Sequence, residues 1–551
     1  MIQSTSDVEF EDGNERPALR PLGLNGSLLA RALASARTIY LLILLNLAIA
    51  VPLAWVIDLF IDEAFSLHTT SKGIRYAFEQ AVYFELQAPL YFVILNLWRA
   101  VNDSIFFARL FSVLCIAATI KIAALLSQRL FKTINPAWFA ALVALHPYAV
   151  WASTQIRLYA FGILLSSLLL LLFHDGFLSD KRSRNARLAY LLVAVIALYT
   201  QYYLGFLLVG NAVALLCLRK WRSLFIYLAG MLLVGLCFIP MLLLVPGQVS
   251  THTQSVKGLL PLTEALRTIS WQIKGFLLPI TAWDESGRME GVRHWLFRLV
   301  YLLVLVALIR AVISSRLRNF LTTGTVVVWS VFITTTLFYI AVIRITGEDM
   351  LQERHSFALF IPSLLFAFSL LAKVADWRAR ISWLLVFLFF SAASLYYAHT
   401  PVAKDTVWSR TAAHIMEAEQ PNQPILIFHA GNALTFAHYY KGMNVLVPIP
   451  YENRFDTYDV RAYVFKDEQQ VNDALARLPG EHESLWLVTD GLCNFIDVDF
   501  NCQGLEDFVN KHYLVEEDKT SFNVRTRRLI RKPISIVPAR LSSNSYIKNS
   551  S

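Results

Sequence analysis

Residues 38–70, TIYLLILLNLAIAVPLAWVIDLFIDEAFSLHTT, decide the fold class of this chain. Their first part, Thr38 to Ile57, is almost entirely apolar and has the length of about 20 residues that a helix needs to cross a bilayer. Asp62 and Glu63 follow side by side where this helix leaves the membrane. Carboxylates are disfavoured at the C-terminal end of a helix, because that end carries partial negative charge. The pair therefore needs a reason beyond local helix electrostatics.

The composition of the whole chain is that of a membrane protein with many spans. Of its 551 residues, 56% are hydrophobic and 16% charged, and the mean hydropathy is +0.50. Soluble domains average about 45–50% apolar and about 25% charged residues. Much of the net charge of +9 lies in short loops between apolar runs, where it sets topology. We predict a polytopic α-helical membrane protein in a lipid bilayer, with no nucleic acid as partner.

Apolar runs that could form spans recur about eleven times. They cover roughly residues 38–58, 105–126, 135–152, 158–174, 188–203, 205–218, 223–245, 294–314, 320–343, 355–372 and 380–398. Loops rich in Lys and Arg alternate with loops of mixed charge, and the positive-inside rule puts the basic loops in the cytoplasm. We expect a multi-pass protein of the inner (plasma) membrane, with a cytoplasmic N-terminus and a periplasmic or extracellular C-terminal region.

The predicted domains follow from these runs and from a change of composition near residue 399. They are a flexible cytoplasmic leader (1–36), a transmembrane domain (37–398) with large outer loops at 59–104 and 246–293, and an extracytoplasmic C-terminal domain (399–551). Within the first outer loop, the short apolar piece 88–98 is expected to lie along the membrane interface rather than cross.

The C-terminal region has the pattern of a small soluble α/β domain. Strand-like runs at 424–430, 444–450 and 484–490 alternate with helix-like stretches. Residues 512–531 indicate a hairpin, whose basic second arm is expected at a solvated edge. Cys493 and Cys502 are compatible with a disulfide, if the region faces an oxidising compartment, and equally with two free thiols.

Acidic residues cluster where the first span ends. Asp58, Asp62 and Glu63 lie within six residues, near lipid, where ionised carboxylates are costly to maintain. Such clusters raise a pKa for proton transfer or hold a cation. The simpler interpretation is a set of solvated carboxylates at a helix end.

Two further stretches on the predicted outer side carry polar residues. YFELQAPLYF, residues 83–92, contains Glu85, Gln87 and Tyr91, and its proline also fits a plain helix start. HPYAVWASTQIRLYAFG, residues 146–162, places an arginine at the boundary between two spans. A lone arginine there usually snorkels to lipid headgroups, whereas a functional one suits a phosphate.

A fourth stretch, GEDMLQERHSFALFIP at 347–362, places Arg354 and His355 at the same boundary. Either side chain could meet an anionic headgroup. Taken together, the four stretches put acids and arginines on one face of the membrane, at the ends of different spans. We interpret them as the border of an active cleft at the outer membrane surface.

The order of these motifs resembles the GT-C class of polytopic glycosyltransferases. It is most similar to the branch of protein O-mannosyltransferases and aminoarabinose transferases, over roughly residues 38–400. The matching elements are Asp62-Glu63, ELQAPLY (85–91), STQIRLY (153–159) and Arg354-His355. Departures from the family pattern are Glu85 for Asp, Gln87 for His, Ala88 for Pro and His355 for Tyr.

The resemblance implies a reaction and a set of roles. A sugar would pass from a polyprenyl-phosphate donor, with inversion, to an acceptor hydroxyl on a lipid, glycan or protein. Asp62 and Glu63 would be catalytic, with Asp62 as general base. The substrate-binding residues would be Glu85, Gln87, Tyr91, Arg157, Tyr159, Arg354 and His355, with the two arginines on the departing phosphate. No metal ligand is assigned, and a divalent cation (Mg or Mn) is optional.

Two other functions fit parts of the sequence. A secondary transporter would use the acids as proton or cation sites and would place charge in mid-span, at interrupted helices. We interpret the spans as lacking charge apart from Asp58 and Lys121, both within reach of an interface, which favours surface chemistry over transport. A scaffold that presents the C-terminal domain would leave the one-sided acids unexplained.

Overall fold

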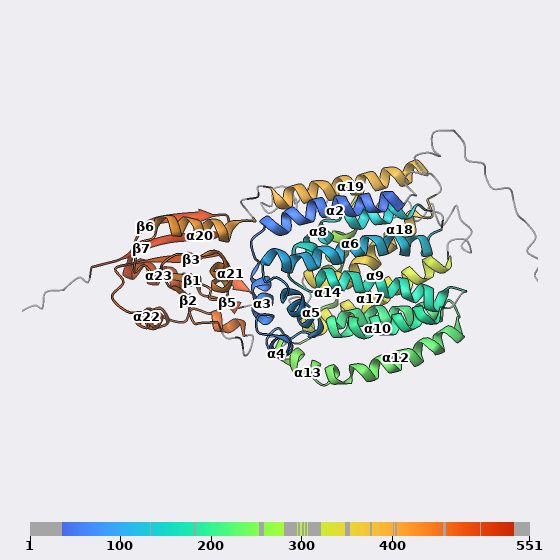
Figure 1. Cartoon of the computed structure of the whole chain (residues 1–551), viewed down its shortest axis with the longest axis horizontal. Coiled ribbons are helices and arrows are strands. Elements are labelled where there is room, and N and C mark those ends of the chain that lie inside the picture. The colour runs from blue at the N-terminus through green and yellow to red at the C-terminus, as the bar shows by residue number, and fades with distance from the viewer. Residues whose placement is uncertain are drawn as a thin grey trace, which may run out of the picture.

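The structure is a computed structural model. It describes residues 36–533, except for 133, 181–182, 253–257, most of 280–320, 348–352, 375–376, 401, 403–404, 454, 456–458 and 496–497. The predicted leader up to residue 35 and most of the predicted span 294–314 therefore lie outside the described residues. The described part has a helical body with a smaller sheet-containing domain at one end (Figure 1).

The helical body contains long apolar helices that confirm a multi-pass membrane protein. Seven helices among the described residues have the length and composition to cross a membrane. They are α2 (Ala36–Val56), α6 (Ile105–Leu130), α9 with its π-helical extension (Tyr159–Leu178), α12 (Trp221–Leu242), α17 (Thr323–Thr346), η5 with α18 (Arg354–Leu371) and α19 (Trp377–His399).

Three other predicted spans are helical but shorter or divided. The run 135–152 forms α7 (Pro136–Ala144) and α8 (Pro147–Thr154), because the side chain of His146 accepts the N–H of Tyr148 and starts a new helix there. The runs 188–203 and 205–218 correspond to α10 (Arg184–Thr200) and α11 (Gly205–Cys217). The count of about eleven spans stays a prediction.

The predicted outer loops fold into short helices. The first contains α3 (Ile61–Thr69), α4 (Ile74–Tyr83) and α5 (Leu90–Arg99), which lie at the end of the body next to the sheet domain (Figure 1). The described part of the second contains α13 (Val245–His252) and α14 (Leu262–Leu277). The apolar piece 88–98 is α5, whose side chains Tyr91, Phe92 and Leu95 are buried.

The C-terminal region forms the predicted small α/β domain. Its strands are β1 (Ile425–Phe428), β2 (Leu446–Ile449), β3 (Ser484–Thr489), β6 (Tyr513–Ser521) and β7 (Val524–Arg531), in the order β2-β1-β3-β7-β6. β1 pairs in parallel with β2 and β3, and β7 pairs antiparallel with β3 and β6. The helices are α20 (Val407–Ala418), α21 (Gly431–Tyr439), α22 (Gln469–Ala476) and α23 (Cys502–His512). Two short strands, β4 (Asn494–Phe495) and β5 (Val498–Asp499), form a separate pair.

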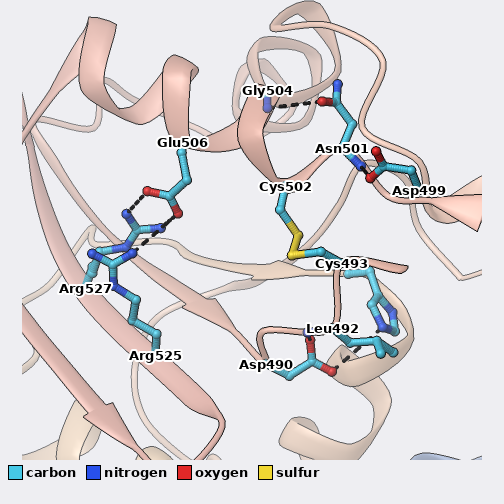
Figure 2. Close-up of a disulfide and its surroundings, with 11 residues drawn as sticks. Asp490, Leu492, Cys493, Asp499, Asn501, Cys502, Gly504, Glu506, Arg525 and Arg527 are labelled. Atoms are coloured by element: carbon cyan, nitrogen blue, oxygen red, sulfur yellow. Dashed lines mark hydrogen bonds and ion pairs between the residues drawn. A yellow bond between two sulfur atoms is a disulfide. The ribbon is translucent and has the colours of Figure 1, made fainter. Parts of the chain in front are cut away.

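The hairpin at 512–531 is confirmed, but its basic arm is not the edge. That arm is β7, which lies between β3 and β6, so β6 forms the edge of the sheet. Arg527 is buried and binds Glu506 of α23 through two hydrogen bonds of 2.7 and 2.6 Å (Figure 2). The expectation of a solvated basic edge was wrong because an acid from another element neutralises this arginine inside the domain.

Cys493 and Cys502 form a disulfide, the first of the two alternatives left by the sequence. It joins the segment after β3 to the first residue of α23, with the two Cα atoms 5.6 Å apart (Figure 2).

Candidate functional site

Asp62 and Glu63 lie in the first turn of a new helix, not at the end of the first span. α2 ends at Val56 and α3 begins at Ile61. Carboxylates in a first turn are stabilised by the positive end of the helix dipole. The electrostatic objection raised by the sequence was therefore wrong, because the chain turns between the two helices.

Glu63 points into the protein and is fully buried. Its two oxygens accept hydrogen bonds of 3.0 and 2.8 Å from the guanidinium of Arg109. They also accept the backbone N–H groups of Phe60 and Ile156, each at 2.9 Å. With both oxygens occupied, Glu63 holds α3 against its neighbours.

Arg109, on α6, is the residue that the sequence argument missed. It is fully buried and also donates to the backbone oxygens of Ala54 (3.2 Å), Ile57 and Asp58 (2.9 Å). It thereby fixes the chain between α2 and α3 and so the start of the helix that carries Asp62. The available signal was an arginine inside the apolar run 105–126, so the interpretation that the spans lack charge apart from Asp58 and Lys121 was wrong.

Asp58 does not join the other two acids. One of its carboxylate oxygens accepts the N–H of Ser409 at 2.8 Å, at the start of α20 in the C-terminal domain. Burial raises the pKa of Asp58, and the hydrogen bonds from Ser409 oppose that shift. The three acids near the first span therefore have three separate environments, so the predicted common cluster was wrong.

Asp62 faces two arginines from distant parts of the sequence. Its carboxylate forms an ion pair with Arg354, in the 3-10 turn η5 (Glu353–Ser356), and about a fifth of each side chain is exposed. Its backbone oxygen lies 3.3 Å from Nη1 of Arg157, which precedes α9.

Arg157 is anchored by Glu85. Its Nη1 donates to an oxygen of Glu85 at 2.8 Å and to the hydroxyl of Ser66 at 2.9 Å. The other Glu85 oxygen accepts from Thr69 at 3.2 Å, and both charged side chains are buried. Burial raises the pKa of Glu85, and the charge of Arg157 opposes that shift. Asp62, Glu85, Arg157 and Arg354 are called the Asp62 cluster below.

The other predicted substrate-binding residues have different surroundings. Tyr91 is buried on α5 beside Phe92, and the guanidinium of Arg157 lies 6.0 Å from the centre of the Phe92 ring. Tyr159 opens α9, and its ring centre lies 6.4 Å from that of His355. Gln87 lies in the connection between α4 and α5.

Several polar atoms around the Asp62 cluster are buried without a partner. Among the described residues, no hydrogen bond reaches Nε of Arg157, Nε of Arg354, the hydroxyl of Tyr91 or Oε1 of Gln87. Buried polar groups are normally hydrogen-bonded, since leaving one unpaired costs about 1–3 kcal/mol. Most of these atoms are donors, and donors beside two guanidinium groups suit an anionic ligand.

The carboxylates do not fit a divalent cation in this arrangement. Asp62, Glu63 and Glu85 are each paired with their own arginine. Within the described part of the chain, no three His, Cys, Asp or Glu side chains are grouped as metal ligands would be. Divalent cations such as Mg²⁺ need convergent oxygen ligands that are free to bind them.

Comparisons with known proteins give structural similarity without sequence similarity. No protein-family profile matches the chain, and no curated protein sequence is similar to it. Among solved structures, ArnT from Cupriavidus metallidurans is similar in its apo state (TM-score 0.43, 14% identity, 90% of this chain and 98% of that one) and bound to undecaprenyl phosphate (0.42, 13%, 92% and 98%). An oligosaccharyltransferase from Archaeoglobus fulgidus, with zinc and sulfate, gives a TM-score of 0.41 at 11% identity over 82% of this chain and 68% of that one.

Proposed function

We propose that this protein is a membrane glycosyltransferase that moves a sugar from a polyprenyl-phosphate donor to an acceptor hydroxyl, with inversion. The observation that carries the proposal is the Asp62 cluster. The partly exposed carboxylate of Asp62 pairs with Arg354, and its backbone oxygen accepts from Arg157, at the end of an apolar helical body with unpaired donors nearby. A base beside a binding site for an anion is what this transfer requires.

Asp62 acts as the general base. It accepts the proton of the acceptor hydroxyl while the acceptor oxygen forms a bond to the anomeric carbon of the sugar. The bond from that carbon to the phosphate oxygen breaks, and its electron pair leaves with the polyprenyl phosphate. A single displacement of this kind inverts the anomeric centre. Asp62 then releases its proton to water, to which about a fifth of its side chain is exposed.

Arg354 links donor binding to the base. In the structure its guanidinium forms an ion pair with the carboxylate of Asp62. A phosphate competes for the same guanidinium, because planar arginine donors bind phosphate oxygens in a bidentate manner. Once Arg354 turns to the phosphate, Asp62 becomes free to accept a proton. The base is therefore available only when the donor is in place.

The remaining residues position these groups. Glu85 and Ser66 hold Arg157 for the second contact with the leaving phosphate. Glu63 acts through Arg109 and not on the substrate, which revises the role suggested by the resemblance. Gln87, Tyr91, Tyr159 and His355 are assigned to the donor sugar and its phosphate, supported by the buried unpaired atoms on Gln87 and Tyr91.

We propose that the helical body lies in an inner membrane, with the Asp62 cluster and the C-terminal domain on its extracytoplasmic side. The cluster and the domain share one end of the molecule, since Ser409 binds Asp58 and the Tyr439 hydroxyl accepts the N–H of Leu59 at 2.6 Å. The disulfide supports an oxidising compartment for that end. Residues 37–398 form the proposed catalytic domain and 399–551 the extracytoplasmic one.

Mass analysis of cell-envelope glycans and glycolipids tests the proposal. Cells that lack the chain should lose one modification, and the wild-type gene should restore it. Asp62→Asn should reach the membrane in normal amounts and fail to restore it, whereas the control Asp103→Asn, at an exposed carboxylate, should succeed. An envelope unchanged by loss of the chain would refute the proposal.

A further inference from the structure

The C-terminal domain has a topological switch point at the ends of two strands. β1 lies between β2 and β3, and all three are parallel. The chain passes from β1 to β2 on one side of it and then to β3 on the other. In open α/β sheets, ligands bind beyond the carboxyl ends of strands at such a point. His429 follows β1 and Asp490 follows β3 at this position.

His429 is buried there with an unsatisfied ring. It is 4% exposed, and neither ring nitrogen has a hydrogen-bond partner among the described residues. Its Nε2 lies 3.8 Å from Oδ2 of Asp490, which accepts the side-chain N–H of Asn432 at 2.8 Å. Burial lowers the pKa of His429, so its neutral ring presents one donor and one acceptor. Such a group is normally paired, which points to a ligand.

The surrounding structure holds this cluster in place. The other Asp490 oxygen accepts the N–H of Leu492 at 3.0 Å, and the next residue, Cys493, is in the disulfide (Figure 2). The rings of Tyr463 and Phe500 lie 5.3 and 5.0 Å from the ring of His429. The Asp490 side chain is 14% exposed, so the cluster reaches the surface at this residue.

The cluster lies beside the helix that carries Asp62. A Cβ added to Gly431, the first residue of α21, would lie 2.9 Å from Cδ1 of Ile61 and 3.3 Å from Nδ1 of His429. Ile61 directly precedes Asp62 in the first turn of α3. The end of β1 therefore lies beside the first turn of α3, the helix that carries the proposed base.

We propose that His429, Asn432 and Asp490 bind a neutral, hydroxyl-rich group, the saccharide part of the acceptor. A carboxylate and an amide, with an imidazole that both donates and accepts, match the alternating donors and acceptors of sugar hydroxyls. The half-buried ring of Tyr463 offers apolar surface, as ligand sites with a few placed polar groups do. The carboxylate of Asp490 disfavours an anion. The inference rests on the proposed function only in assigning the saccharide to the acceptor.

Binding to the purified full-length protein in detergent tests this site. The probes are neutral di- and trisaccharides and the same sugars carrying a carboxylate or phosphate, observed by saturation-transfer NMR. The wild type should bind neutral sugars in preference to the anionic ones. His429→Leu and Asp490→Asn should weaken binding at least about tenfold, because each removes hydrogen bonds to the ligand. The controls His482→Leu and Asp473→Asn, elsewhere in the same domain, should bind as the wild type does.

Two further measurements separate a loss of sugar binding from a loss of folding and from a loss of transfer. The midpoint of thermal unfolding should not fall in His429→Leu, because the variant removes an unpaired buried polar group. If it does fall, sugar binding by Asp490→Asn tests the site instead. Asp62→Asn should bind sugar normally while failing in transfer, and an active Asp62→Asn would refute the catalytic proposal but not this site. Failure of the wild type to bind any neutral sugar, preference for the anionic sugars, or normal binding by Asp490→Asn would overturn the inference.

Discussion

The buried pair of Glu63 and Arg109 should carry much of the stability around the Asp62 cluster. Arg109→Met removes both hydrogen bonds to Glu63 and also those to three backbone oxygens. Removing one partner of a buried ion pair costs about 3–5 kcal/mol. Glu63→Gln leaves Arg109 bound to the same three oxygens, so we expect the smaller loss of a charged hydrogen bond, about 1.5–3 kcal/mol.

The two variants should therefore differ by about 2 kcal/mol, roughly 30-fold in the unfolding equilibrium constant. Reversible unfolding by SDS in mixed micelles, followed by tryptophan fluorescence, measures this difference. The double variant should lose less than the sum, by about 0.5–3 kcal/mol, because the two residues share one interaction. The exposed pair Arg75 and Glu79 is the matched control, and its disruption should leave the midpoint unchanged. Equal losses in the two variants, or strict additivity, would show that the backbone contacts of Arg109 and its pairing with Glu63 do not contribute as proposed.

Three other predictions concern Arg354, Asp58 and the disulfide. Arg354→Gln should raise the apparent KM for a polyprenyl-phosphate sugar about tenfold, as a donor titration would show, because it removes a charged contact with phosphate; an unchanged KM would exclude that contact. Asp58→Asn should not lower the unfolding midpoint at pH 7, whereas Asp58→Leu should, since only the amide still accepts from Ser409. Folding raises the pKa of Asp58, so above its folded-state pKa the ionised carboxylate destabilises the folded protein. Lowering the pH through that pKa should therefore raise the stability of the wild type relative to Asp58→Asn, which has no carboxylate at this position. Alkylation in intact cells should find Cys493 and Cys502 oxidised, and labelled thiols there would put the domain in the cytoplasm.

Hydrophobic patterns made much of the fold predictable. The runs that contain β1, β2 and β3 are short and apolar between polar turns, and the length of the apolar runs predicts the long helices. The hydrophobic pattern did not predict which strand lies at the edge of the sheet. The arginines of β7 suggested solvent, yet Arg527 is buried because Glu506 comes from a helix that pattern alone does not pair with it.

The candidate site was predictable in its residues and not in its pairings. The sequence singled out Asp62, Arg157 and Arg354, which the structure brings together across as many as 292 positions. It could not separate the roles of Asp62 and Glu63, because that depends on Arg109 facing one of two adjacent carboxylates. Local sequence carries no record of a contact between segments so far apart.

In the proposed reaction, Asp62 removes a proton from the acceptor as a lipid-linked sugar is transferred. The most direct measurement is the single-turnover release of polyprenyl phosphate from its sugar, in the presence of acceptor, by purified wild type and Asp62→Asn. We predict that the variant still binds the donor and releases polyprenyl phosphate about 10²–10⁴ times more slowly. Release at the wild-type rate by Asp62→Asn would show that Asp62 is not the base.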